Sequence, residues 1–150
     1  MEIERKFLLD RLPDLVPESC GVVYQGYLSV HPEVRIRCYQ APDGSKTYTL
    51  TVKGEGTLSR EEAETPITAS FYQTASALID KPMIRKDYFR YRYANRILEC
   101  SVVDQSFCYG EVEFDTEAEA LAFQWPLPGA RDVTHDPHYK MKHYWEETRL

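Results

Sequence analysis

The sequence has no Cys-x-x-Cys spacing, no long apolar run and no low-complexity tract. Its four cysteines, Cys20, Cys38, Cys100 and Cys108, lie far apart, so we predict neither a zinc site nor a disulfide framework. No apolar stretch approaches the roughly 18 residues of a membrane span, and the N-terminus lacks the basic and apolar regions of a secretory signal. We therefore expect a cytoplasmic protein with free thiols that does not enter a membrane.

The chain also lacks an excess of positive charge. It holds 18 basic and 24 acidic side chains, a net charge of −6 at pH 7, which argues against nucleic acid as its main partner. Its 150 residues are enough for a real core, and we expect a single domain over residues 1–150, as a monomer or a homodimer. The arginines and lysines gather in short β-like segments, so a local cationic site is compatible with the acidic balance.

What the chain does have is a charged pentad at its start, Glu2-Ile3-Glu4-Arg5-Lys6. In a β-strand successive side chains point to opposite faces, so Glu2, Glu4 and Lys6 would share one face. Unpaired charges are expensive to bury among apolar groups. This face is therefore predicted to meet water or a polar cavity.

The same alternation, with one charged face, recurs along the chain between turn residues. The segments and their aligned charges are Val34–Cys38 with Arg35 and Arg37, Tyr48–Lys53 with Lys53, Ser59–Glu64 with Arg60, Glu62 and Glu64, Ile84–Tyr93 with Lys86 and Arg90, Ile97–Val103 with Glu99, and Glu111–Phe114 with Glu111 and Glu113. For one strand, the solvated outer face of a half-buried sheet explains the pattern. Within residues 85–93, however, both faces carry charge or hydroxyl groups. A closed antiparallel barrel with a charged lumen explains the whole set better.

Three helices are predicted to brace this barrel. Apolar residues recur at helical spacing within residues 68–79. Thr116 and Glu119 have the spacing of a capping box at a helix N-terminus. Asp136 can cap a third helix, with Pro137 suited to its first turn. The predicted fold class is thus α+β.

The ordered series of charged motifs resembles the CYTH family, the triphosphate tunnel metalloenzymes. The motifs that carry the resemblance are Glu2-x-Glu4-x-Lys6, Arg35-x-Arg37, Leu50-Thr51-Val52-Lys53-Gly54, Ser59-Arg60-x-Glu62-x-Glu64, Arg85-Lys86, Leu98-Glu99, Glu111-x-Glu113 and Asp132-Val133-Thr134-x-Asp136-Pro137-x-Tyr139. They run in the family's order over nearly the whole chain. The resemblance implies an eight-stranded antiparallel β-barrel, the triphosphate tunnel. Family members include inorganic triphosphatases, thiamine triphosphatases and class IV adenylate cyclases.

The resemblance also implies roles for the aligned charges. The substrate-binding set is Arg35, Arg37, Lys53, Arg60, Lys86 and Arg90. The metal-binding set is Glu2, Glu4, Glu62, Glu64, Glu111 and Glu113. The catalytic set is Lys6, Lys53 and Glu99. These roles agree with the chemistry of the side chains, since guanidinium forks bind phosphate oxygens in pairs and carboxylates hold hard cations.

The metal expected in such a site is Mg²⁺ or Mn²⁺. Carboxylates two residues apart on a strand place two oxygens within reach of one ion, so the pairs Glu2/Glu4 and Glu111/Glu113 are the first choice of ligands. Zn²⁺ is disfavoured because no histidine or cysteine cluster accompanies them. The sequence leaves open whether one ion or two would bind.

The leading functional hypothesis is metal-dependent hydrolysis of a small triphosphate, most simply inorganic tripolyphosphate. Two alternatives use the same charged cage: an adenylate cyclase of class IV type, and a module that binds polyphosphate or a nucleotide without turnover.

Three residues depart from the family pattern. Ser101 replaces a common acid, Tyr88 replaces a common base and His138 replaces a common arginine. Ser101 and Tyr88 favour the binding module, because hydroxyl groups cannot replace these charges.

Overall fold

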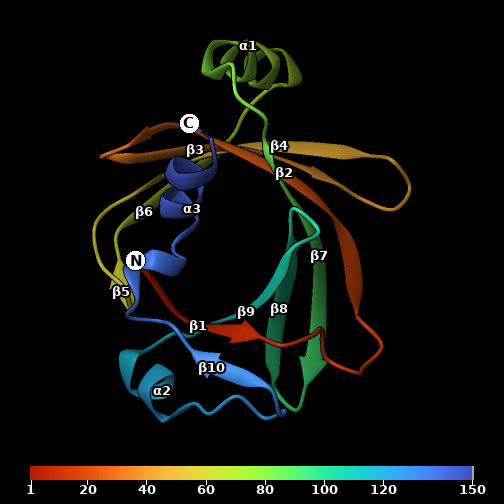
Figure 1. Cartoon of the computed structure of the whole chain (residues 1–150), viewed down its shortest axis with the longest axis vertical. Coiled ribbons are helices and arrows are strands. Elements are labelled where there is room, and N and C mark those ends of the chain that lie inside the picture. Colours follow the sequence, from red (N-terminus) through yellow and green to blue (C-terminus); the bar gives the residue numbers. More distant parts are fainter. Residues whose placement is uncertain (150) are drawn as a thin grey trace.

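The computed structural model describes residues 1–149 and places ten β-strands in one antiparallel sheet that curls into a barrel (Figure 1). The strands are β1 Glu2–Leu9, β2 Ser19–Val30, β3 Glu33–Gln40, β4 Lys46–Lys53, β5 Ser59–Arg60, β6 Glu62–Pro66, β7 Ile84–Tyr93, β8 Arg96–Val103, β9 Phe107–Glu113 and β10 Ala130–Asp132. The α+β class and the antiparallel barrel are confirmed.

The number of strands differs from the eight that were predicted. Hydrogen-bonded neighbours follow the order β10-β1-β9-β8-β7-β2-β3-β4-β6, a path of nine, and β5 pairs with β1 off this path. One cause is the short β10, which pairs with Phe7, Leu8 and Leu9 near the end of β1. The other is an interruption at Glu61, which separates β5 from β6. Since β5 pairs with the start of β1, this interrupted segment brings the two ends of the sheet together.

The alternation of side chains divides the barrel wall into a charged inside and an apolar outside. On β9, Tyr109, Glu111 and Glu113 line the lumen, whereas Cys108 and Val112 belong to an apolar cluster on the other face. That cluster packs between the wall and the segments that cover it. The main apolar core thus lies outside the barrel, and the interior is left for polar groups.

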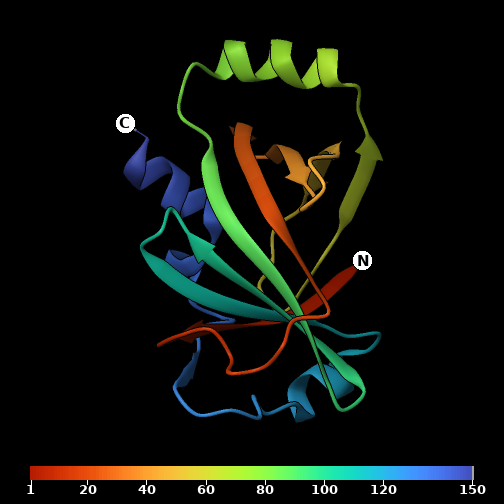
Figure 2. The ribbon, with the colours of Figure 1, turned by 90° about the vertical axis from the view of Figure 1, so that its right-hand side faces the viewer.

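Three α-helices and one short 3₁₀ helix cover the barrel. They are α1 Ala69–Ile79, α2 Glu117–Ala122, η1 Pro137–Tyr139 and α3 Met141–Thr148. In the side view α1 lies above the barrel and α2 below it (Figure 2). The predicted caps are present: the Thr116 hydroxyl accepts from the Glu119 amide, and the Asp136 carboxylate accepts from the His138 amide. No helix within residues 1–149 is long and apolar enough to cross a membrane.

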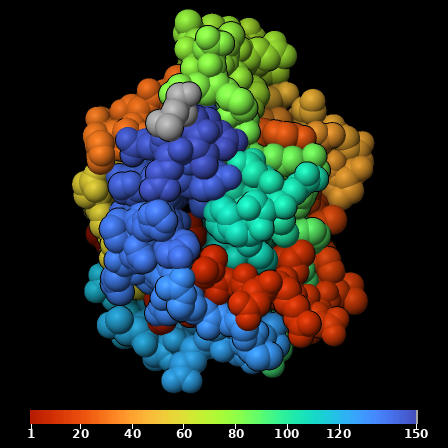
Figure 3. All heavy atoms as spheres, viewed as in Figure 1, coloured from red at the N-terminus to blue at the C-terminus, as the bar shows by residue number. Residues whose placement is uncertain are grey.

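Helix α3 packs against the barrel and, with the segment before it, forms the blue part of the face seen in Figure 3. Trp145 packs against the ring of Tyr27, with 5.7 Å between ring centroids, inside a cluster that also holds Ile84 and Tyr109. Arg149 secures the end of the helix by donating to the carboxylate of Asp104 at 3.0 Å and to two backbone carbonyl oxygens. The C-terminal segment therefore holds a fixed position beside the lumen.

Arg5 anchors strand β1 from the outer face of the barrel. Its guanidinium donates to Asp132 at 2.5 Å, and also to the carbonyl oxygens of Ala120 and Phe123 at the end of α2. The hydroxyl of Thr134 accepts one hydrogen bond from the Arg5 guanidinium and another from the backbone amide of Lys6. The N-terminal strand is thereby fixed, with its carboxylates directed into the lumen.

Candidate functional site

The barrel encloses a cavity of about 330 Å³ that is lined mostly by charged and hydroxyl-bearing side chains. Thirteen of the residues predicted for the site line this cavity: Glu2, Glu4, Lys6, Arg35, Arg37, Lys53, Arg60, Glu62, Glu64, Lys86, Glu99, Glu111 and Glu113. Glu64 and Glu113 are exposed, whereas Arg35, Lys53 and Lys86 are buried and the other basic side chains are half-buried. The structure thus brings these predicted residues to one place and leaves their roles to be argued from geometry.

Arg35 and Arg37 are incompletely hydrogen-bonded where they line the cavity. Arg37 donates to the Gln25 side-chain oxygen at 2.9 Å, and Arg35 lies 3.5 Å from the Thr51 hydroxyl. The Nε atoms of both arginines are buried and have no hydrogen-bond partner among residues 1–149. Buried donors are normally satisfied, so orphan guanidinium groups facing a cavity indicate a site for an anion.

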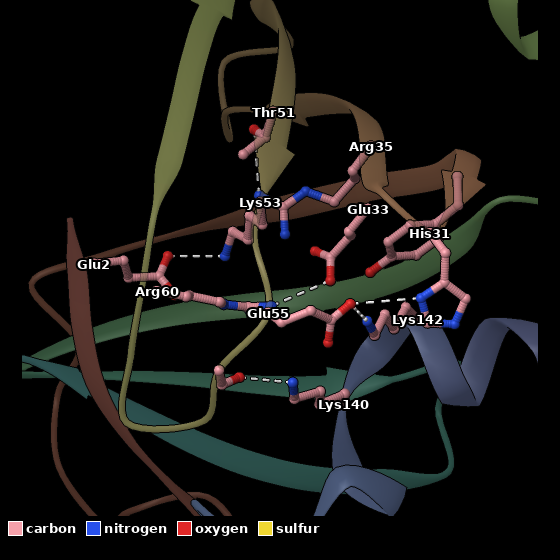
Figure 4. A network of polar contacts seen from close by, with 12 residues as sticks. Glu2, His31, Glu33, Arg35, Thr51, Lys53, Glu55, Arg60, Lys140 and Lys142 are labelled. Atoms are coloured by element: carbon pink, nitrogen blue, oxygen red, sulfur yellow. Dashed lines mark hydrogen bonds and ion pairs between the residues drawn. The ribbon is translucent and has the colours of Figure 1, made fainter.

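A second group of charges is already paired (Figure 4). Glu2 accepts from Lys53 at 2.8 Å and lies 3.4 Å from Arg60. Arg60 also contacts Glu33 at 3.2 Å, a carboxylate that is 4% exposed. Because these pairs are largely buried, water screens them little. They hold the charged wall in shape near the start of β1.

Inside the tunnel the carboxyl group of Glu4 contacts that of Glu111, and the carboxyl group of Glu2 contacts that of Glu62. Burial raises the pKa of Glu4 well above its ordinary value, and the adjacent Glu111 raises it further. Burial also acts on Glu111, but the ammonium groups of Lys6 and Lys86 outweigh it and hold its pKa low. A hydrogen bond with Glu2, together with burial, raises the pKa of Glu62 to about 7. Each pair can therefore share a proton, as carboxyl groups in contact do when no cation separates them.

The C-terminal segment adds three contacts that the sequence did not indicate. The ammonium of Lys6 donates to the backbone carbonyl of Tyr139 at 2.7 Å. Lys140 donates to the carbonyl of Gly56 at 2.7 Å, and Lys142 lies 3.4 Å from Glu55 (Figure 4). Both lysines line the cavity, where they add positive charge beside the loop between β4 and β5.

Arg90 is the one predicted site residue that the structure places outside this cavity. It lines a neighbouring depression at the rim, where its side chain is 40% exposed and lies 3.5 Å from Glu99. Glu99 also accepts from the hydroxyl of Tyr88 at 3.0 Å. Arg90 lies on the same face of β7 as Lys86, four residues further along the strand and closer to the rim of the cavity. In this structure it orients Glu99 and does not reach the interior.

Lys86 is the most isolated cation of the site. It is 4% exposed, and no hydrogen bond or ion pair to its ammonium is present among the described residues. Burial, followed by repulsion from Arg37, lowers its pKa well below the ordinary lysine value. The folded protein thus holds a charge that it would lose easily, which is typical of functional sites.

We expect Lys86→Met to stabilise the fold near neutral pH while it weakens anion binding. Replacing buried ion pairs by apolar side chains of similar size is often neutral or stabilises proteins by about 1–4 kcal/mol, and Lys86 has no ion-pair partner within residues 1–149 that the change would leave exposed. Because the pKa of Lys86 is lower in the folded state than in the unfolded state, the unfolded chain binds more protons between those two values, and wild-type stability rises with pH there. The stability gain of the variant should therefore shrink as the pH approaches about 10.4, the ordinary value. Urea unfolding at a series of pH values measures this. A variant that is less stable at pH 7 would contradict it.

The carboxylates do not form a ready-made metal site. Within residues 1–149, no group of three or more His, Cys, Asp and Glu side chains is placed to hold an ion without other ligands. The contacting pairs Glu4/Glu111 and Glu2/Glu62 nevertheless offer hard oxygen ligands, and a cation would relieve their mutual repulsion. Mg²⁺ is commonly held by one or two carboxylates together with substrate phosphates. The donor set fits an ion that completes its coordination with a phosphate.

The fold and the cavity together define a β-barrel protein with a charged tunnel whose incompletely bonded guanidinium groups suit a polyanion. No family model matches the sequence. An inorganic triphosphatase from Nitrosomonas europaea is 31% identical over 149 residues, which cover 94% of each chain. A crystal structure of an inorganic triphosphatase superposes with a TM-score of 0.67 at 28% identity, covering 96% of this chain and 93% of that one.

A Hippeastrum protein described as an adenylyl cyclase with a dominant triphosphatase activity shares the fold, with a TM-score of 0.56 at 17% identity. The superposition covers 81% of this chain and 84% of the Hippeastrum chain. At 17% identity the likeness concerns the fold alone. The chain belongs to the same family as the Nitrosomonas europaea inorganic triphosphatase, the CYTH family of triphosphate tunnel proteins. The resemblance stated from the sequence is confirmed.

Proposed function

We propose that this protein hydrolyses inorganic triphosphate in the tunnel with the help of Mg²⁺ or Mn²⁺. The observation that carries the proposal is the meeting of incompletely bonded, buried guanidinium groups and contacting carboxyl pairs in one cavity. Such a cavity is short of negative charge at the arginines and short of positive charge at the carboxylates. A metal–triphosphate complex supplies both. The relationship to an inorganic triphosphatase supports the same substrate.

In this proposal the basic side chains bind and orient the substrate. Arg35 and Arg37 present guanidinium donors with free Nε atoms, which suit two-point contact with phosphate oxygens. Lys86 adds a point charge next to them, and Lys53 does the same beside Glu2. Fixing the chain of phosphates in one orientation supplies much of the rate enhancement in phosphoryl transfer.

The acidic side chains have two proposed tasks. Glu4 and Glu111, together with Glu2 and Glu62, would hold the divalent ion, which polarises phosphate oxygens and lowers the pKa of water when it is bound. Glu99 is the proposed acceptor of the proton that the attacking water releases. Burial, and next the charge of Glu111, raise the pKa of Glu99, which makes it a better base than an ordinary carboxylate. Water would add to a terminal phosphorus as the bond to the bridging oxygen breaks, giving phosphate and diphosphate.

A phosphate-release assay with tripolyphosphate, ATP and thiamine triphosphate, each with Mg²⁺, Mn²⁺ or a chelator, tests this proposal. We expect release from tripolyphosphate that requires a divalent ion. Cyclic AMP with diphosphate as products would instead assign a cyclase. Tight binding of tripolyphosphate without release would assign a binding module, the reading that Tyr88 and Ser101 favour. Location in the cytoplasm and the monomeric or homodimeric state stay predictions.

A further inference from the structure

Three hydroxyl-bearing side chains form a neutral row across the charged wall of the tunnel. Tyr109, Ser101 and Tyr88 are successive partners across β9, β8 and β7, and all three line the cavity. We call them the hydroxyl row. The adjacent row on the same strands is charged, with Glu111, Glu99 and Arg90. The hydroxyl row therefore lies directly beside a charged row on the same three strands.

Tyr109 contributes more than its hydroxyl, because two lysines lie near its ring. The ammonium of Lys6 is 4.0 Å from the ring centroid, and that of Lys86 is 5.3 Å from it. Tyr109 is 1% exposed, so these contacts are shielded from water. The negative face of an aromatic ring attracts cations, and the attraction is strongest where water is excluded.

On the tunnel wall, Lys86 has the ring of Tyr109 as its cation–π partner. Its ammonium has no carboxylate within ion-pairing distance and no hydrogen-bond acceptor among the described residues. The residue opposite Tyr109 on β8 is Ser101, which is buried and carries no charge. A ring can orient an ammonium group without occupying its N–H donors, whereas a carboxylate would accept from them. The donors of Lys86 thus stay available to a phosphate oxygen.

We propose that Tyr109 is a positioning residue, which holds Lys6 and Lys86 over its ring and leaves the donors of Lys86, and those of Lys6 that the Tyr139 carbonyl does not take, to the substrate anion. The inference rests on the proposed function, because it assigns these two lysines to the triphosphate. Ser101 lies on the same face of β8 as Val103, the partner of Lys86, and an uncharged residue there offers Lys86 no competing ion pair. Tyr109 acts here through the lysines and makes no direct contribution to bond breaking.

Titration calorimetry of tripolyphosphate with chelator present, together with steady-state kinetics, tests the role of the ring. Tyr109→Leu removes the ring and should weaken binding and raise KM about tenfold, with a smaller change in kcat, as expected for the loss of a shielded cation–π contact. Tyr109→Phe keeps the ring and should bind within about twofold of wild type. Tyr91→Leu is the matched control, because Tyr91 is equally buried but lies in the outer apolar cluster. It should lose stability and keep its affinity.

A second variant keeps the inference testable if Tyr109→Leu does not fold. Ser101→Asp would place a carboxylate beside Lys86 and should also weaken tripolyphosphate binding about tenfold, since that ion pair must break before the anion binds. Wild-type affinity in Tyr109→Leu, or in Ser101→Asp where Tyr109→Leu does not fold, would overturn the proposal, and so would an equal loss in Tyr109→Phe. Failure of the proposed function looks different: wild type would then bind tripolyphosphate without releasing phosphate, and the order of affinities among the variants would still hold.

Discussion

Replacing Glu4 by glutamine is expected to lower metal-dependent phosphate release from tripolyphosphate by at least about a hundredfold, the scale of effect seen when metal sites lose a supporting group. The amide keeps the shape of the side chain but cannot supply the negative oxygen that a hard cation requires. Little change in folding should accompany the loss. The raised pKa shows that Glu4 is easily protonated in the free tunnel, so a neutral side chain is already tolerated there.

Glu61→Gln is the matched control for this experiment. Glu61 interrupts the strand between Arg60 and Glu62, both of which line the tunnel, but its own side chain is exposed and does not line the cavity. The control should keep wild-type activity and wild-type dependence on Mg²⁺. If Glu4→Gln also turned over tripolyphosphate at the wild-type rate, Glu4 would be removed from the metal site. Thermal unfolding of both variants checks that any loss of activity is not a loss of structure.

The second large effect is expected for Arg37→Ala, which should raise the KM for tripolyphosphate about 10- to 100-fold. The variant loses a charge-assisted hydrogen bond, and such bonds contribute roughly 1.5–3 kcal/mol. The buried Nε of Arg37 has no protein partner to compensate, so the substrate is its natural acceptor. Arg37→Lys should fall between wild type and alanine, because it keeps the charge and loses the planar fork.

Arg92→Ala controls for the general loss of one positive charge. Arg92 lies near the end of β7 and does not line the cavity; its side chain is 59% exposed and pairs with Glu18 at 3.0 Å. Exposed pairs of this kind contribute little, so both activity and stability should stay near wild type. An unchanged KM in Arg37→Ala would remove Arg37 from the binding site, even if the enzyme proved to be a triphosphatase.

Period-2 alternation made most of the tunnel predictable. Once a segment is a strand, the face of each charge follows, so Glu2, Arg37 and Glu111 could be placed in the lumen from spacing alone. Glu33 was missed although it shares the phase of Arg35, because the predicted segment began at Val34 and the strand begins one residue earlier. Errors of this kind come from strand ends, which local sequence specifies weakly.

Other parts of the site depend on tertiary contacts that spacing does not encode. Lys140 and Lys142 reach the tunnel because α3 packs against the barrel through Trp145, a contact between distant segments. The strand β9 begins at Phe107, whereas the predicted segment began at Glu111, so the sequence did not place the ring of Tyr109 in the tunnel. Arg90 shares the strand face of Lys86 but lies at the rim, outside the cavity. Alternation predicts the face on which a side chain lies, and it does not predict where along the strand the cavity ends.

In the proposed mechanism, one charged lumen holds both the polyanion and its metal. Crystals grown with Mn²⁺ and an imido-bridged triphosphate that cannot be hydrolysed test this arrangement. The anomalous signal of Mn²⁺ should lie against Glu4 and Glu111, with phosphate density reaching toward Arg35 and Arg37. Anion density on the outer surface, with an unchanged lumen and no Mn²⁺ at these carboxylates, would contradict the account.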